Sequence, residues 1–115
     1  MTKYSLNVTS VLPFLEGKPQ QVIILCHGYG GDGRDISVLA NNWRRFLPNA
    51  IFLCPDAPEI CSVNSEGYQW FDLMPEDESK IVENSLIAEK KLNLFINEIL
   101  ESLNLSPDKL GLVGF

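Results

Sequence analysis

The chain has 115 residues, of which 45% are apolar, and it carries a formal net charge of −6 at pH 7. This length and apolar content predict one small domain, 1–115, with a packed core, and they exclude wholesale disorder. The acidic balance and the lack of a long basic cluster argue against nucleic acid as a partner, and the apolar runs are too short to predict a membrane span.

The predicted elements begin with edge-strand material. Residues 4–15 alternate loosely between apolar and polar side chains and are interrupted by Pro13, which is typical of one or two edge strands. Residues 22–26 form an unbroken apolar run rich in β-branched side chains, which predicts a buried strand. Four of the next seven residues are glycine. We expect the following helix to begin near Ile36, with Asp35 as its cap.

That first helix should present one apolar stripe and end before Pro48. Residues 50–54 then predict a second buried strand. Residues 59–77 show no regular period and predict a long ordered loop, which is more often functional than idle. The stripe residues of the helix, at helical spacing, are Ile36, Leu39, Ala40, Trp43, Phe46 and Leu47.

A long helix over 78–103 and a last buried strand over 110–115 complete the chain. The order strand, helix, strand, helix, strand predicts an α/β fold with a mostly parallel sheet, flanking helices and right-handed crossovers. Strand 22–26 should therefore lie between strands 50–54 and 110–115. The expected core stripe of the long helix is Ile81, Ser85, Ala88, Leu92, Phe95, Ile99 and Leu103.

The glycine-rich segment 28–33 allows a dinucleotide-binding interpretation. It matches Gly-x-Gly-x-x-Gly between a strand and a helix, and Asp56 follows at a distance suited to a ribose contact. Against this, Asp32 and Asp35 would put negative charge where a pyrophosphate binds, and the helix is expected to start after the third glycine.

Two other interpretations remain open for the same segment. In an oxyanion loop, backbone N–H groups of a His-Gly-x segment after a strand stabilise a tetrahedral intermediate, and His27, Gly28 and Tyr29 have that pattern. Glycines would let such a backbone approach a substrate closely. In the simplest interpretation, the glycines only form a turn between strand and helix.

Four sequence blocks, in order, carry a resemblance to a known family. They are Leu-Cys-His-Gly-Tyr-Gly-Gly-Asp-Gly-Arg-Asp at 25–35, Phe-Leu-Cys-Pro-Asp-Ala-Pro-Glu at 52–59, Gly-Tyr-Gln-Trp-Phe-Asp at 67–72 and Leu-Gly-Leu-Val-Gly-Phe at 110–115. Together they resemble the phospholipase/carboxylesterase family of α/β-hydrolases, which includes the acyl-protein thioesterases. The resemblance implies a serine hydrolase of carboxylic esters or thioesters.

The resemblance also implies roles for particular residues. His27, Gly28 and Tyr29 would form the oxyanion loop, with the Tyr29 N–H as donor, and His27 would not be the general base. Trp70 and Phe71 would border the acyl pocket. The resemblance further implies that no cofactor or metal is needed, and that the substrate would be a small ester or acyl thioester if the rest of the enzyme were present.

Gly114 and Phe115 match the first two positions of the family's Gly-x-Ser-x-Gly nucleophile elbow. The family's catalytic serine, aspartate and histidine would follow, so we expect a truncated α/β-hydrolase, the N-terminal part of a single domain, that is inactive alone. A non-catalytic binding module is the alternative. A nucleophile rebuilt from Ser62, Ser65 or a Cys61–His27 pair is also conceivable.

Three cysteines and one histidine raise the question of zinc. Cys26, His27, Cys54 and Cys61 could gather at the strand ends. Their spacing lacks a Cys-x-x-Cys pair, however, and Cys26 and Cys54 are expected to face the core as small apolar residues. We therefore expect no metal. The odd cysteine count and the lack of a signal-peptide pattern favour the cytoplasm.

The predicted sheet also has consequences for assembly. Strand 110–115 should form an unpaired, hydrophobic sheet edge. Part of each sheet face should lack a covering helix. We therefore expect a homo-oligomer formed through this edge.

Overall fold

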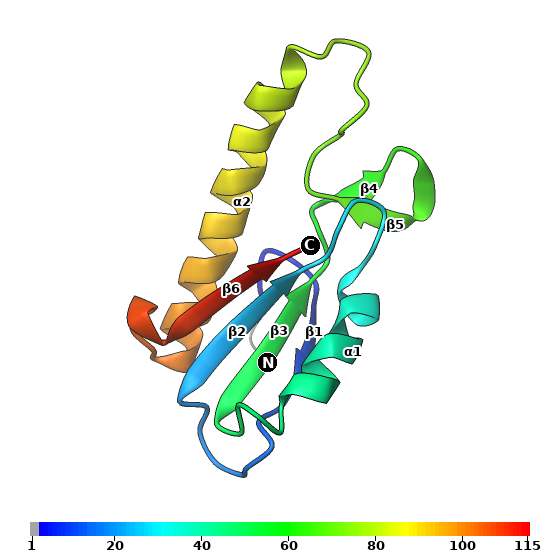
Figure 1. The fold of residues 1–115 in the computed structure, drawn as a ribbon. Coiled ribbons are helices and arrows are strands. Elements are labelled where there is room, and N and C mark those ends of the chain that lie inside the picture. Colours follow the sequence, from blue (N-terminus) through cyan, green and yellow to red (C-terminus); the bar gives the residue numbers. More distant parts are fainter. Residues whose placement is uncertain (1–2) are drawn as a thin grey trace.

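The computed structural model describes residues 3–115 and has three layers (Figure 1). A four-stranded sheet in the order β1-β3-β2-β6 has helix α2 packed against one face and helix α1 against the other. A two-stranded hairpin, β4–β5, stands apart from the sheet. The elements are β1 Val8–Val11, β2 Gln21–Cys26, α1 Gly33–Trp43, β3 Ala50–Pro55, β4 Glu59–Cys61, β5 Asn64–Gln69, α2 Lys80–Leu103, a 3-10 helix Pro107–Lys109 and β6 Leu110–Gly114.

The sheet has the predicted topology. Strand β2 runs parallel to both neighbours, with Ile24 beside Leu53 of β3 and Leu112 of β6. Strand β1 is a single antiparallel edge strand on β3. The α/β fold and the central position of β2 are therefore confirmed. Because β2, β3 and β6 are parallel, their carboxyl ends meet at one edge of the sheet, which is where ligands bind in open α/β folds.

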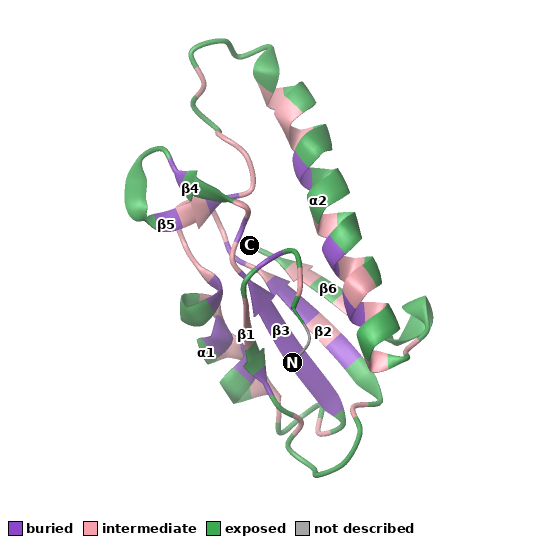
Figure 2. Ribbon diagram, turned by 180° about the vertical axis from the view of Figure 1, so that it is seen from behind, coloured by how far each residue is buried: buried purple, intermediate pink, exposed green. Residues whose placement is uncertain are grey.

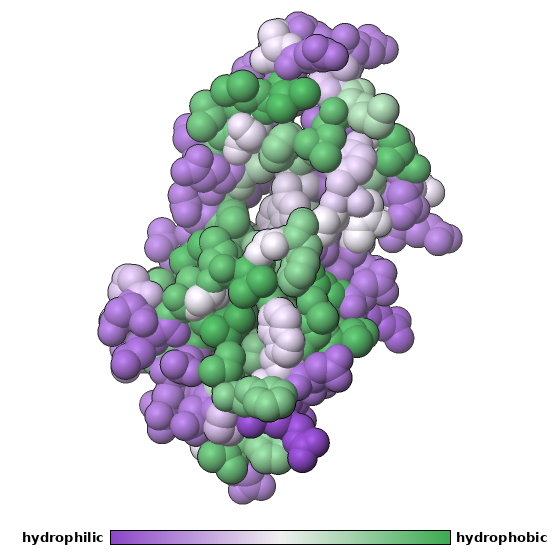
Figure 3. Space-filling view, viewed as in Figure 1, coloured by the Kyte–Doolittle hydropathy of each residue, from purple (hydrophilic) through white to green (hydrophobic). Residues whose placement is uncertain are grey.

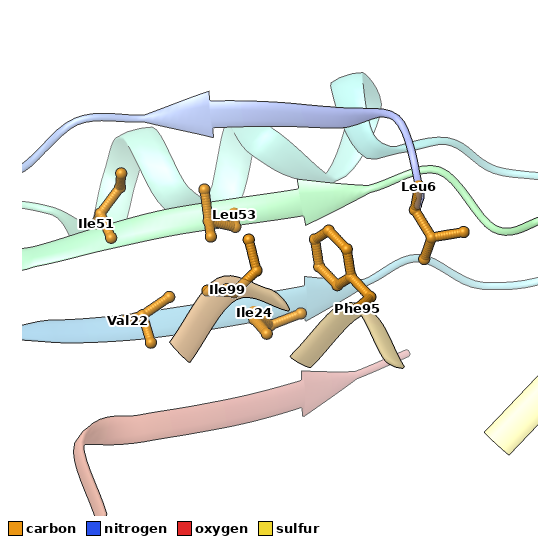
Figure 4. Close-up of a cluster of buried hydrophobic side chains, with 7 residues drawn as sticks. All are labelled: Leu6, Val22, Ile24, Ile51, Leu53, Phe95 and Ile99. Atoms are coloured by element: carbon orange, nitrogen blue, oxygen red, sulfur yellow. The ribbon is translucent and has the colours of Figure 1, made fainter. Parts of the chain in front are cut away.

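The core lies on both faces of the two central strands. All six residues of β3 are buried (Figure 2), as expected for a parallel strand covered on both faces. On the α2 face, side chains from the sheet meet two side chains of the helix and one from the N-terminal segment (Figure 4). This cluster consists of Leu6, Val22, Ile24, Ile51, Leu53, Phe95 and Ile99.

Helix α2 is longer than the sheet that it covers. Its 24 residues span about 36 Å, whereas the strands of the sheet have four to six residues. The predicted stripe packs on the core in the second half of the helix, through Phe95 and Ile99. Ile81 and Ser85, in the first half, are only half-buried. The helix begins at Lys80, two residues later than predicted.

The predicted first helix is wrong at both ends. It starts earlier than predicted, and it ends before the last two residues of the predicted stripe. Helix α1 begins at Gly33, and its cap is Asp32, whose carboxylate accepts the Asp35 N–H at 2.7 Å. Asp32 has the extended backbone of an N-cap, whereas Asp35 already lies in the first turn. The helix ends at Trp43, so Phe46 falls outside it and is 82% exposed. Leu47 also lies beyond the helix and is exposed.

The segment 59–77 is also more regular than predicted. It contains the β4–β5 hairpin, which carries an irregularity between Ile60 and Cys61. Only three of the hairpin's nine strand residues are buried. Short strands with so little buried surface show no hydrophobic alternation, so the sequence pattern does not predict them.

Strand β6 forms one edge of the sheet, as predicted. Leu112 is 52% exposed and Phe115 is 64% exposed. Hydrophobic side chains gather over the middle of the face that carries this strand (Figure 3). No helix within residues 3–115 is both long enough and apolar enough to cross a membrane.

Candidate active site

The glycine loop, defined as residues 27–32, lies where the carboxyl ends of the parallel strands meet. It follows β2 directly and touches the end of β6. The Phe115 N–H donates to the Cys26 carbonyl at 3.2 Å. A Cβ at Gly28 would lie 3.3 Å from the Phe115 carbonyl oxygen. The close approach of the two backbones therefore favours glycine at position 28.

His27 is 3% exposed, and both of its ring nitrogens are engaged. Nε2 accepts the Ala57 N–H at 2.9 Å, and Nδ1 lies 2.7 Å from the Gly28 carbonyl oxygen. A carbonyl can only accept and an N–H can only donate, so the ring is neutral, with its hydrogen on Nδ1. No ring nitrogen is left to take a proton from a nucleophile, which argues against a Cys61–His27 pair.

The second half of the glycine loop is bonded to the hairpin. The Gly30 N–H donates to the Tyr68 carbonyl at 2.9 Å, and the Tyr68 N–H donates to the Gly31 carbonyl at 2.8 Å. The Asn64 amide donates to the Gly30 carbonyl at 2.9 Å. A Cβ at Gly67 would lie 2.0 Å from that same carbonyl oxygen. The hairpin can approach the loop this closely only because residue 67 is glycine.

Trp70 holds the first half of the glycine loop. Its indole N–H donates to the His27 carbonyl at 2.9 Å, and the two rings lie 5.6 Å apart between centroids. The Gly31 N–H donates to the Gly28 carbonyl at 3.1 Å. By contrast, the N–H groups of Gly28 and Tyr29 have no acceptor within residues 3–115.

Gly28 and Tyr29 line a small pocket of about 180 Å³. Trp70 and Phe71, which sequence resemblance implied as acyl-pocket residues, line the same pocket. Apart from the backbone of the glycine loop, its walls are mainly aromatic and aliphatic, which suits an apolar chain with a polar group at one end. The lining residues are His27, Gly28, Tyr29, Trp70, Phe71, Leu73 and Phe115.

The Tyr29 hydroxyl belongs to a polar cluster that no sequence pattern predicted. It lies 2.9 Å from Ser62 Oγ and donates to Asp72 Oδ1 at 3.0 Å. The Ser62 hydroxyl and the Met74 N–H also donate to Asp72 Oδ1, each at 3.0 Å. The Met74 N–H, and to a lesser extent the two hydroxyls, lower the pKa of the Asp72 carboxyl. The quoted block 67–72 contains Asp72, but nothing in its spacing links it to Tyr29.

The amino end of α1 argues against the dinucleotide-binding interpretation. The helix does begin at the third glycine, Gly33, contrary to our expectation. However, Asp56 accepts the Gly33 N–H at 2.8 Å, so it is not placed to bind a ribose. The Asp35 N–H is bonded to Asp32. Two carboxylates of the chain thus occupy the N–H groups that a pyrophosphate would use, and they would repel it.

The cysteines lie in apolar surroundings. Cys54 is fully buried, and Cys26 packs against the core on the α2 face. Burial raises the pKa of both thiols to about 11, helped at Cys54 by the charge of a neighbouring Cys26 thiolate. Within residues 3–115, no three His, Cys, Asp or Glu side chains are grouped as a metal site requires.

Solved structures share this architecture. The crystal structure of esterase PE8 matches 99% of the chain with a TM-score of 0.85 and 34% identity, over 53% of its own length. Zea mays acyl-protein thioesterase 2 matches 95% of the chain with a TM-score of 0.57 and 26% identity, over 46% of its length. A carboxylesterase from Mesorhizobium loti shares the fold over 84% of the chain, with a TM-score of 0.64 and 24% identity, over 43% of its length.

The chain thus spans about half the length of the solved structures that it matches. A model of the family described as Phospholipase/Carboxylesterase matches residues 12–115. This match takes in β2, the glycine loop, the hairpin and β6 in one alignment. The chain belongs to the phospholipase/carboxylesterase family of α/β-hydrolases.

Proposed function

We propose that the chain forms the part of a carboxylic-ester or thioester hydrolase that carries the oxyanion loop, with the Tyr29 N–H as one donor of the oxyanion hole. The proposal is supported by a backbone N–H that has no acceptor among the described residues and that lies at an apolar pocket beside the end of β6. A donor that is held in place before reaction stabilises the charge that develops on a carbonyl oxygen.

The pocket supports an acyl substrate. Its aromatic and aliphatic walls can cover a hydrocarbon chain, and the glycine loop can bind the carbonyl oxygen at one end. Esters and acyl thioesters have this combination. The name of the similar esterase PE8 and that of the maize acyl-protein thioesterase point to the same two substrate classes.

The 115 residues alone should not turn over an ester. Their single histidine has both ring nitrogens bonded, so residues 3–115 provide no imidazole base. We expect the purified chain to give no labelling with a fluorophosphonate probe and no hydrolysis of p-nitrophenyl butyrate. Labelling that persists in a His27→Ala variant would reveal an unrecognised nucleophile and contradict this expectation.

The oxyanion assignment is tested in a chimera. Residues 1–115 replace the matching part of esterase PE8, and p-nitrophenyl butyrate hydrolysis is measured. Tyr29→Pro removes the proposed donor and should lower kcat by about 100-fold or more. Tyr29→Phe, which keeps the N–H and the ring and removes only the hydroxyl, should lower kcat less than Tyr29→Pro does. Equal kcat values for Tyr29→Pro and Tyr29→Phe would overturn the assignment.

Self-association through β6 is a second proposal, and it concerns a non-catalytic role. The exposed Leu112 and Phe115 at the sheet edge favour it, because an unpaired apolar strand edge readily pairs with another chain. Sedimentation velocity at micromolar concentration should show a dimer or larger species. A single monomer boundary would contradict it.

We also propose a cytoplasmic location, supported by three unpaired cysteine thiols. Thiols remain reduced in the cytoplasm, whereas oxidising compartments favour disulfides. Cell fractionation followed by thiol labelling checks this. Recovery of the protein in an oxidising compartment would contradict it.

A further inference from the structure

Three segments of the chain that are distant in sequence converge on one carboxylate oxygen. Asp72 Oδ1 accepts hydrogen bonds from Tyr29 in the glycine loop, from Ser62 between β4 and β5, and from the Met74 backbone. Tyr29 is 43 residues from Asp72 in the sequence, and Ser62 is ten residues from it. The cluster therefore connects the glycine loop, the hairpin turn and the segment leading to α2.

This cluster is suited to neutral pH. The Met74 N–H, together with the two hydroxyls, lowers the pKa of the Asp72 carboxyl, so the group is ionised and accepts bonds as a carboxylate. Hydrogen bonds to an ionised acceptor are stronger than bonds between neutral groups. The Tyr29 and Ser62 hydroxyls also lie 2.9 Å from each other. Their two hydrogens allow two hydrogen bonds at a time among the three side chains, so either both hydroxyls donate to Asp72 or one of them donates to the other.

Among the central residues of the glycine loop itself, only Tyr29 has a side chain that can restrain the loop. The residues between His27 and Asp32 are Gly28, Tyr29, Gly30 and Gly31. Glycine backbones have the widest conformational freedom, and glycine has no side chain to restrain the loop. Gly30 and Gly31 are bonded to Tyr68 by their backbones, but the N–H groups of Gly28 and Tyr29 have no acceptor in the described chain. The peptide group that carries the Tyr29 N–H is held at its Gly28 carbonyl by His27 Nδ1 and the Gly31 N–H. The Tyr29 ring and hydroxyl provide the side-chain restraint on the same residue.

We propose that Asp72 and Ser62 are positioning residues that hold the Tyr29 N–H at the pocket by binding the Tyr29 hydroxyl. This inference rests on the proposed function, because it assigns a purpose to the position of that N–H. The two residues act through Tyr29 and touch no substrate. Loss of either residue leaves the Tyr29 N–H intact but lets the glycine loop adopt other orientations.

The loop restraint is measured by ¹⁵N relaxation of the Tyr29 amide in the 115-residue chain. The wild type should give an order parameter near the rigid-backbone value of roughly 0.85, and Asp72→Ala should bring it toward 0.6 or below. Asp72→Asn should restore part of the rigidity, because its amide oxygen can still accept the hydrogen bond of the Tyr29 hydroxyl. If Asp72→Ala does not fold, Tyr29→Phe makes the same prediction.

Asp77→Ala is the matched control. Asp77 accepts bonds from the backbone and hydroxyl of Ser79, within its own turn. Its removal should leave the Tyr29 order parameter at the wild-type value. The proposal is overturned if the order parameter of the residue-29 amide is as high in Tyr29→Phe and Asp72→Ala as it is in Asp77→Ala.

The consequence for catalysis is measured in the esterase chimera. Asp72→Ala should lower kcat by about tenfold to a hundredfold with little change in KM, because a displaced donor weakens transition-state binding. An unchanged kcat in Asp72→Ala, with Tyr29→Pro still inactive, overturns the positioning role and leaves the oxyanion assignment standing. A Tyr29→Pro chimera with full activity contradicts the oxyanion assignment. The relaxation data would still show whether Asp72 restrains the glycine loop through the Tyr29 hydroxyl.

Discussion

The two ends of strand β2 are stabilised by different forces. Near its start, Val22 and Ile24 lie in an apolar cluster with Phe95 and Ile99 of α2 (Figure 4). Just beyond its end, the glycine loop is held by directional hydrogen bonds from the hairpin, Trp70 and Asp72. Apolar burial stabilises a fold without specifying the orientation of any one group, whereas hydrogen bonds specify orientation. Stability and site geometry should therefore respond to different substitutions.

The largest expected effect comes from removing a core side chain. Phe95 is fully buried between α2 and the sheet, so Phe95→Ala should lower the free energy of unfolding by about 3–5 kcal/mol. Urea denaturation measures this loss. In molecules that remain folded, the Tyr29 order parameter should be unchanged. If Phe95→Ala loosened the glycine loop as much as Asp72→Ala does, the two ends of β2 would be coupled, contrary to this expectation.

Phe46→Ala is the control for that substitution. Phe46 is exposed and lies outside α1, so the same change should alter stability by no more than about 0.5 kcal/mol. A large loss at Phe46 would show that this face of the molecule is covered in solution.

A smaller effect is expected at the other end, from Gly67→Ala. The added Cβ would meet the Gly30 carbonyl oxygen at 2.0 Å, so the hairpin must move away from the glycine loop. We expect a loss of about 1–3 kcal/mol in stability. Faster amide exchange at Tyr68, whose N–H is bonded to Gly31, should accompany it. At Gly114, where a Cβ meets nothing within 4 Å, alanine serves as the control. Slow exchange at Tyr68 in Gly67→Ala would contradict this account.

The last effect arises where the ends of β2 and β3 meet; it is absent at neutral pH and appears only in alkaline solution. Burial raises the pKa of Cys26 and Cys54 to about 11 from an ordinary 9. The unfolded thiols therefore lose their protons first, so stability is full below pH 9 and falls as the pH rises toward 11. Urea midpoints across this range should decline less in a Cys26→Ala/Cys54→Ala variant. Equal declines of the urea midpoint in the wild type and in the double variant would contradict the raised thiol pKa values.

The elements with strong hydrophobic patterns could be predicted well from the sequence. The apolar runs at 22–26, 50–54 and 110–115 became β2, β3 and β6 in the expected order. The hairpin could not be predicted in this way, because most of its strand residues are exposed. The helix cap was misassigned by three residues, because Asp32 and Asp35 are both plausible caps and only the backbone angles distinguish them.

Sequence alone determined the fold class, the family resemblance and the place of the glycine loop after the central strand. Those features depend on patterns among residues that are close together in the sequence. Only the tertiary structure showed that Asp56 covers the amino end of α1, that both nitrogens of His27 are bonded, and that Asp72 binds the Tyr29 hydroxyl. Such contacts join residues tens of positions apart. No local periodicity encodes them, because they exist only once the sheet has brought the strand ends together.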